Sequence, residues 1–165
     1  MSISKLTGTS WTNISKVDGV TASGISKVAG VDVPVDYFLD THSSPVAAYS
    51  LRKLSSSATT AITVENSSGT TLDIGFDSSG NLDTSALTTH CGSNYGRVSK
   101  WWDQSGNNRH MEQSTAASRP YIVDNSGNVL TTTDNSITAL NFYFQSTARW
   151  LEDTFVSNNA DEILI

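Results

Sequence analysis

The residues best suited to chemistry form one short run, Asp103 to Asn108, which follows two adjacent tryptophans. Its carboxylate and amide side chains offer clustered oxygens, which sugar hydroxyls and hard cations such as Ca²⁺ both require. The same residue types also bond their own backbone and tolerate left-handed angles, as tight turns demand. The run therefore predicts either a structural turn capped by Asp103 or a binding loop built on Asp103, Asn107 and Asn108. Because two oxygens from one loop are too few to hold Ca²⁺, we expect no bound metal.

Trp101 and Trp102 offer a second kind of chemistry, the stacking of an indole against the apolar face of a sugar ring. Both lie near the end of a predicted strand from Arg97 to Asp103, in which successive side chains point to opposite faces. One indole is therefore expected to enter the core, the more frequent use of tryptophan, and the other to cover a helix or stay exposed. Both are candidate glycan contacts, and the sequence does not decide between them.

Other reactive arrangements are missing from the sequence. It holds no Gly-rich phosphate loop, no Cys/His cluster and no Ser-His-Asp pattern. Cys91 is the only cysteine, so no disulfide can form within the chain, and we expect it to be a small buried residue. His110 has no second histidine or carboxylate at a ligand's spacing and is expected to be a surface or half-buried histidine. We expect no cofactor and no catalytic residue.

The balance of charge argues against nucleic acid as a partner. With 16 acidic and 10 basic residues the formal net charge is −6, and the basic residues are scattered. Proteins that bind a phosphate backbone instead gather Lys and Arg on one face. No stretch approaches the roughly 20 apolar residues of a membrane span. We therefore expect neither a nucleic-acid partner nor a membrane-spanning segment.

The composition favours strands and turns over helices. The chain contains 26 Ser and 20 Thr, and only 16% of its residues are charged. Threonine is β-branched and suits a pleated sheet, whereas serine suits turns. The apolar pattern predicts two short helices, one at 46–54 after a Ser-Pro start and one at 83–91 between a capping Asp83 and Gly92. Strands are predicted at 37–40, 61–64, 72–76, 97–103, 120–123, 137–144 and 163–165.

The amino-terminal residues repeat every eleven positions. An Ile-Ser-Lys motif, followed by Leu or Val and then by Gly two places later, begins at Ile3, Ile14 and Ile25. This period is shorter than a helical repeat, so each copy is expected to hold one short strand and one turn. Three such units each expose an apolar edge that needs a neighbour. Residues 1–35 are therefore predicted to form an extended arm that anchors the chain. Its predicted contacts are Ile3, Leu6, Ile14, Val17, Ile25 and Val28.

An ordered series of motifs in the middle of the chain resembles a known pattern. It consists of AAYSLRKL at 47–54, DIGF at 73–76, WDQSGNNRHMEQ at 102–113 and RPYIV at 119–123. The series resembles the amino-terminal part of the β-sandwich catalytic domain of B-type fungal α-L-arabinofuranosidases. It is also similar to bacteriophage proteins with concanavalin A-like or laminin-G-like jelly rolls. The match covers about half of the chain, and the motif at 102–113 is its most specific part.

The resemblance implies a mostly β fold, a jelly-roll-like β-sandwich with short helices over residues 36–165. We expect this domain to be incomplete at its C-terminal end, because the chain stops in the apolar strand at 163–165 whereas C-termini usually lie in polar company. In the arabinofuranosidases the catalytic acid and nucleophile lie beyond the matched segment. The acids present here do not match them, so we expect no enzyme activity. These acids are Asp103, Glu112, Asp124 and Glu152.

The amino-terminal repeat resembles the first segments of marine phage structural proteins, which implies a place in a virus particle. The expected function is a structural component of a phage virion, either a tail or head fibre or an attached decoration. The arm would bind other virion proteins or symmetry mates during assembly in the host cytoplasm, with a trimer favoured. An alternative is a glycan-binding module that recognises a host surface glycan. A third candidate is an arabinofuranosidase-like glycoside hydrolase, which would need a pair of flanking carboxylates.

Overall fold

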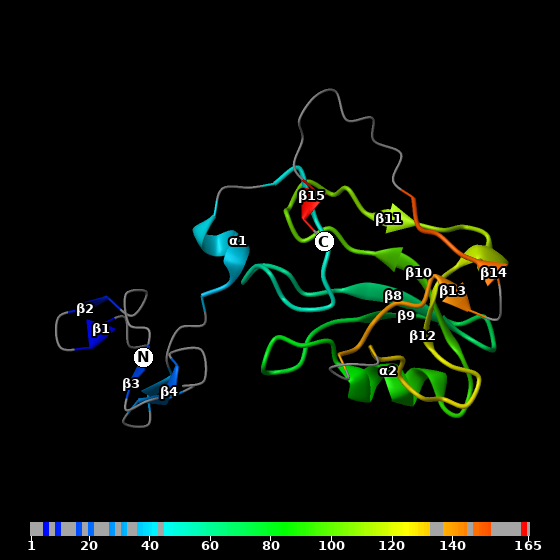
Figure 1. Cartoon of the computed structure of the whole chain (residues 1–165), viewed down its shortest axis with the longest axis horizontal. Coiled ribbons are helices and arrows are strands. Elements are labelled where there is room, and N and C mark those ends of the chain that lie inside the picture. The colour runs from blue at the N-terminus through cyan, green and yellow to red at the C-terminus, as the bar shows by residue number, and fades with distance from the viewer. Residues whose placement is uncertain are drawn as a thin grey trace.

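The structure of the chain is a computed structural model (Figure 1). It describes residues 36–42, 45–132, 137–144 and 147–152, together with seven two-residue strands in the remainder of the chain. The fold is mostly β, an antiparallel sheet with a few short helices, and it is consistent with the expected β-sandwich. None of the described helices is long and apolar enough to cross a membrane.

A five-stranded antiparallel sheet forms the centre of the fold. Its path is β11-β10-β8-β9, and the fifth strand, β12, pairs with β10. Its strands lie at or within two residues of the predicted segments where these exist, while the short β11 was not predicted. The strands are β8 (Ile62–Asn66), β9 (Thr71–Ile74), β10 (Gly96–Trp101), β11 (Met111–Glu112) and β12 (Tyr121–Val123).

One face of this sheet carries the hydrophobic core, which α2 (Thr84–Cys91) covers from below in Figure 1. The predicted helix ends are confirmed: Asp83 accepts a hydrogen bond from the Ala86 amide at 2.9 Å, and Gly92 ends the helix with a φ of 59°. Cys91 is buried as expected, and burial raises the pKa of its thiol. The fully buried apolar residues of this core are Ala61, Ile62, Val64, Ile74, Leu87, Val98, Ile122 and Val123.

Two predicted elements near the start of the domain are wrong. The strand expected at 37–40 is instead a single helical turn, α1 (Phe38–Thr41), on which the rings of Phe38 and His42 stack with centroids 4.2 Å apart. The helix expected at 46–54 is an extended segment that contains β7 (Ala47–Ala48). Its backbone groups bond side chains of a distant loop, described below, and these bonds replace those a helix would make.

Short strands complete the described parts of the chain. The predicted C-terminal strand is confirmed as β15 (Ile163–Leu164), which pairs in parallel with β7. The segment predicted at 137–144 is strand-like only in part: it makes isolated bridges at Thr138 and Asn141 and ends in β13. The remaining elements are β13 (Tyr143–Phe144), β14 (Thr147–Ala148) and the 3₁₀ turn η3 (Ala116–Ser118).

The three copies of the eleven-residue repeat form three similar hairpins. Each copy contributes two short strands and not one, and the two strands pair antiparallel. The equivalent pairs Leu6 with Thr9, Val17 with Val20 and Val28 with Val31 close the three hairpins. The strands are β1 (Lys5–Leu6), β2 (Thr9–Ser10), β3 (Lys16–Val17), β4 (Val20–Thr21), β5 (Lys27–Val28) and β6 (Val31–Asp32).

Gly96, the first residue of β10, lies against the buried side chain of Cys91 at the end of α2. A Cβ atom at this position would lie 2.6 Å from Cys91 Sγ and 3.0 Å from Val64 Cγ1. Neither neighbour has room to move, because both side chains belong to the buried core. We predict that Gly96→Ala lowers the free energy of unfolding by about 1–3 kcal/mol, the usual cost of overpacking a core.

Urea denaturation followed by circular dichroism measures this cost. Ser67→Ala serves as the control, because Ser67 is exposed in the turn after β8, and its free energy of unfolding should stay within about 0.5 kcal/mol of the parent. A Gly96→Ala protein as stable as the parent would show that α2 does not pack tightly on β10.

Candidate functional site

A β-bulge decides which side chains of β10 reach the open face of the sheet. The register with β8 shifts between Val98 and Lys100, so Ser99 is an extra residue on β10. Ser99 and Lys100 consequently lie on the same face, and the alternation then resumes with Trp101 on the core and Trp102 opposite it. Bulges commonly re-aim side chains in this way. The expectation that the two tryptophans face opposite sides is confirmed.

Trp102 is held rigidly on the open face. Its indole N–H donates to Thr63 Oγ1 at 2.9 Å, and the Thr63 hydroxyl donates in turn to Asp73 Oδ1 at 2.6 Å. The His110 ring lies beside the indole, with centroids 4.5 Å apart, and Lys100 Nζ is 4.7 Å from the centre of the Trp102 ring. These contacts fix the orientation of a half-buried aromatic surface.

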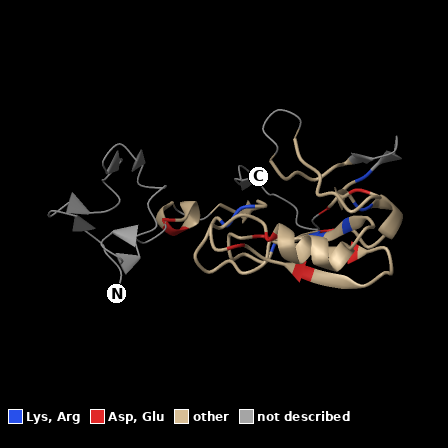
Figure 2. Cartoon of the chain, turned by 90° about the horizontal axis from the view of Figure 1, so that it is seen from below, with Lys and Arg blue, Asp and Glu red and all other residues tan. Residues whose placement is uncertain are grey.

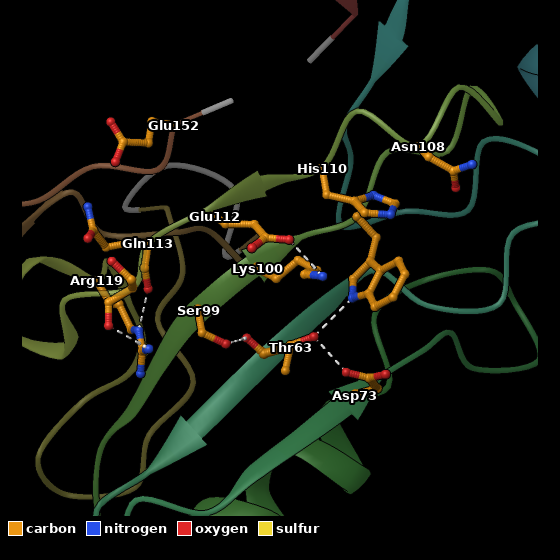
Figure 3. A pocket seen from close by; sticks show the side chains of 12 residues that line it. Thr63, Asp73, Ser99, Lys100, Asn108, His110, Glu112, Gln113, Arg119 and Glu152 are labelled. Atoms are coloured by element: carbon orange, nitrogen blue, oxygen red, sulfur yellow. Dashed lines mark hydrogen bonds and ion pairs between the residues drawn. The ribbon is translucent and has the colours of Figure 1, made fainter. Parts of the chain in front are cut away.

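A groove of about 690 Å³ lies along this face beside Trp102 (Figure 3). Strands β8, β9 and β10 form its floor, and the chain from 108 to 114 forms one wall. Most of the residues that line it are polar, which distinguishes this face from the apolar face under α2. The lining residues are Thr63, Asp73, Ser99, Lys100, Trp102, Asn108, His110, Glu112, Gln113, Ser114, Arg119 and Glu152.

Both cations that line the groove already have anionic partners. Lys100 Nζ lies 2.7 Å from Glu112 Oε1, and Arg119 Nη1 lies 2.7 Å from Glu65 Oε2. The other two nitrogens of Arg119 donate to the carbonyl oxygens of Gln113 and Ser114, at 2.7 Å and 3.0 Å. Figure 2 shows that acidic and basic residues alternate along the described ribbon and do not gather in separate regions. Within the described residues no three His, Cys, Asp or Glu side chains gather as a metal site.

Gln113 lines the groove and carries a buried donor. Only 4% of this residue is exposed, and its Oε1 accepts a hydrogen bond from the Thr115 amide at 2.9 Å. This bond fixes the orientation of the side-chain amide, so the other end is the Nε2 donor. Among the described residues Nε2 has no hydrogen-bond partner. In Figure 3 the Gln113 amide lies at the opposite end of the groove from His110.

The carboxylate of Asp103 is occupied by hydrogen bonds from within the chain and has a structural role. Its Oδ1 accepts from the amides of Ala48 and Ser105, both at 2.8 Å, and its Oδ2 accepts from the Ser105 hydroxyl at 2.8 Å and the Arg109 amide at 3.1 Å. The Asp103 amide donates to Nδ1 of His110 at 3.1 Å. Four donors leave little of the carboxylate for a sugar or a cation, which favours the structural turn over the binding loop.

The next residues of the same loop bind the extended segment 45–54. Gln104 accepts from the Leu54 amide at 2.8 Å and donates to the carbonyl oxygens of Ser50 and Arg52, at 2.9 Å and 3.0 Å. The amide of Asn107 donates to the carbonyl oxygens of Pro45 and Val46, at 3.1 Å and 3.0 Å. Two of the motifs that carried the resemblance are therefore joined by hydrogen bonds in space.

The structure divides the predicted site residues into three groups. Trp102 and Asn108 line the groove, and Asn108 adopts a φ of 57°. Trp101 and Asp103 do not line it, because the first packs on the core and the second is saturated by donors. Asn107 holds the segment 45–54. Of the predicted anchor contacts, Leu6, Val17 and Val28 lie in β1, β3 and β5, while Ile3, Ile14 and Ile25 lie outside the described residues.

Most of the groove was not found from the sequence. Thr63, Asp73 and Ser99 are small polar residues that alternate with core positions, a pattern that predicts only a wet sheet face. Glu112 and Glu152 do not match the catalytic acids of the arabinofuranosidases, and nothing in the local sequence indicates that these two residues face each other. They do so in an isolated bridge, in which the Glu112 amide donates to the Glu152 carbonyl at 2.8 Å.

Comparison with known proteins adds a partial likeness. No protein-family model and no curated protein matches the chain. Solved structures of arabinofuranosidases are similar to part of it: a GH54 α-L-arabinofuranosidase soaked with a cyclic sulfate inhibitor is 36% identical, with a TM-score of 0.38. An arabinofuranosidase complexed with arabinofuranosyl-α-1,2-xylobiose is 34% identical, with a TM-score of 0.39. Each match covers 42% of this chain and 15% of the enzyme.

We predict that Asp103→Asn destabilises the fold. An asparagine keeps one acceptor oxygen and turns an NH₂ group toward at least one of the donors that Asp103 now binds. The expected loss in the free energy of unfolding is about 2–4 kcal/mol, measured by thermal and chemical denaturation.

Asp77→Asn is the matched control. Asp77 also caps a turn, yet among the described residues only its Oδ1 accepts hydrogen bonds, from the Ser79 and Asn81 amides at 2.8 Å and 2.9 Å. An asparagine there keeps both bonds, so stability should change by less than about 0.5 kcal/mol. Equal losses in the two variants would contradict the role given to Asp103.

Proposed function

We propose that the chain is a carbohydrate-binding protein that holds a neutral region of a glycan in the groove beside Trp102. The observation that carries the proposal is the indole itself, fixed by Thr63 and partly exposed in a groove of about 690 Å³. This volume lies within the range of small-ligand sites, about 300–1,000 Å³. An aromatic platform surrounded by hydrogen-bonding groups matches a sugar, which has an apolar face and a rim of hydroxyls.

The polar lining supplies both kinds of hydrogen-bonding partner that sugar hydroxyls need. Carboxylate oxygens of Asp73, Glu112 and Glu152 accept, and the Gln113 amide donates. A sugar hydroxyl both donates and accepts hydrogen bonds. Hydroxyls on the two sides of one ring can therefore bond the carboxylates and the Gln113 side chain. The rigid setting of Trp102 lowers the ordering cost of binding. Binding without cleavage is the proposed activity, and we expect no nitrophenol release from a nitrophenyl arabinofuranoside.

The amino-terminal hairpins favour a second, compatible role as an anchor. The specific observation is that all three copies of the repeat close in the same register. Equal units in series suit a partner with a repeated or symmetric surface. We propose that they fix the chain to a larger assembly, and a phage virion is the assembly that the sequence repeat favours.

Trp102→Ala tests the binding site. We expect the full-length protein to bind neutral glycans on an array, and the variant to bind the same glycans at least tenfold more weakly. A tenfold loss corresponds to about 1.4 kcal/mol, within reach of one aromatic contact. Trp102→Phe, which keeps a ring but loses the bond to Thr63, should retain part of the affinity.

Trp150→Ala is the matched control for this variant. Trp150 is 48% exposed and does not line the groove, so its removal should leave glycan binding unchanged. Thermal unfolding of each variant checks that the domain remains folded. An array without signal at millimolar glycan would contradict the proposed function.

A change in the arm tests the anchor. We predict that Ile14→Asp combined with Ile25→Asp abolishes incorporation into purified particles while the domain from residue 36 onward stays folded. The physical reason is that burying each isoleucine contributes roughly 1.5–3 kcal/mol, which a carboxylate forfeits. Ser15→Asp with Ser26→Asp, at the neighbouring polar positions, is the control and should assemble at normal copy number. Normal assembly of the isoleucine variant would show that the arm is not the anchor.

A further inference from the structure

We propose that the groove takes a neutral oligosaccharide of at least two sugar rings, lying along β10 from Trp102 to Gln113. This inference rests on the proposed carbohydrate binding and specifies the length and charge of the ligand. Three observations carry it. They are the distance between Trp102 and Gln113, the buried donor of Gln113, and the excess of carboxylates over cations in the lining of the groove.

The register between β10 and β11 sets the spacing. Lys100 pairs with Glu112, and the backbone N–H of Gln113 donates to the Ser99 carbonyl at 2.9 Å. Gln113 is therefore level with Ser99, three residues before Trp102. At about 3.3 Å per residue the two ends are roughly 10 Å apart, somewhat less across the bulge. A single ring stacked on Trp102 does not reach that far, whereas two linked rings do.

The buried amide of Gln113 gives the far end a defined chemistry. Its Nε2 donor is unpartnered among the described residues, and the residue is only 4% exposed. A buried donor is costly to leave without an acceptor, so a ligand oxygen delivered there is strongly favoured. A hydroxyl or carbonyl oxygen on the second ring supplies this acceptor.

The charges along the groove disfavour an acidic ligand. Three carboxylates line it, those of Asp73, Glu112 and Glu152, whereas Lys100 and Arg119 are engaged by Glu112 and Glu65. No side-chain hydrogen bond or ion pair holds the Glu152 carboxylate within the described part of the chain. A uronate or sulfate would therefore face uncompensated negative charge, which disfavours binding.

The test is a length series measured by calorimetry on the full chain. The neutral probes are cello-, malto- and chito-oligosaccharides of one, two and three rings, and the acidic probes are oligogalacturonates of the same lengths. We expect at least one neutral series to gain tenfold or more in affinity between one ring and two. The oligogalacturonates should bind more weakly than that series at every length.

Variants separate the two ends of the groove. Trp102→Ala should lower the affinity for ligands of all lengths. Gln113→Met should remove most of the gain in affinity that the second ring gives, and leave the affinity for one ring unchanged. If the methionine variant unfolds, the length series on the unchanged protein still tests the inference, because a site for one ring predicts no gain in affinity from the second ring. Glu152→Gln should narrow the difference between neutral and acidic probes.

The outcomes distinguish this inference from the proposed function. Equal affinity for one and two rings, or tighter binding of oligogalacturonates, would overturn the inference while carbohydrate binding stands. A uniform loss at all lengths in a folded Gln113→Met protein would also overturn it, because a purely structural role gives that pattern. If no probe binds and the glycan array is also blank, both fail together.

Discussion

The side chains of Asp103 and Gln104 hold the segment 45–54 against the loop that follows β10, and Asn107 adds two further hydrogen bonds between them. The first two side chains bond the backbone of Ala48, Ser50, Arg52 and Leu54, an extended stretch of which only Ala48 lies in a strand, β7. Buried backbone groups must find partners, and here side chains supply them. With this segment fixed, Tyr49 packs on Trp101 and closes one end of the core.

The groove exists because one face of the sheet carries polar side chains and is open to solvent. On β8, Thr63 and Glu65 alternate with the buried Ile62 and Val64. An antiparallel sheet tolerates this arrangement, since it needs cover on only one side. Polar side chains on the open face hold each other in place, as Thr63 does between Trp102 and Asp73. The rigidity that suits the face to ligand binding therefore comes from its own hydrogen bonds.

Sequence patterns predicted the elements whose causes are local. The helix at 84–91 begins and ends where Asp83 and Gly92 indicate, because a cap acts over three or four residues. The failure at 46–54 has a distant cause: the bonds that keep this segment extended come from residues about fifty positions away. Tertiary bonds of this kind override local propensity. The candidate site was predicted only at Trp102 and Asn108, since the remaining lining depends on strand register.

The extra residue at Ser99 has a consequence for how this strand can vary in length. A chain lacking Ser99 would keep regular alternation, with Lys100 and Trp102 on the open face and Trp101 on the core. A chain lacking Trp101 would instead turn Trp102 inward and leave the groove without its indole. Within three positions of one strand, the effect of a deletion thus differs: loss of Ser99 keeps the indole in the groove, whereas loss of Trp101 removes it. Related chains can differ in length at the bulge and still present the same surface, although a residue-by-residue alignment would record a gap there.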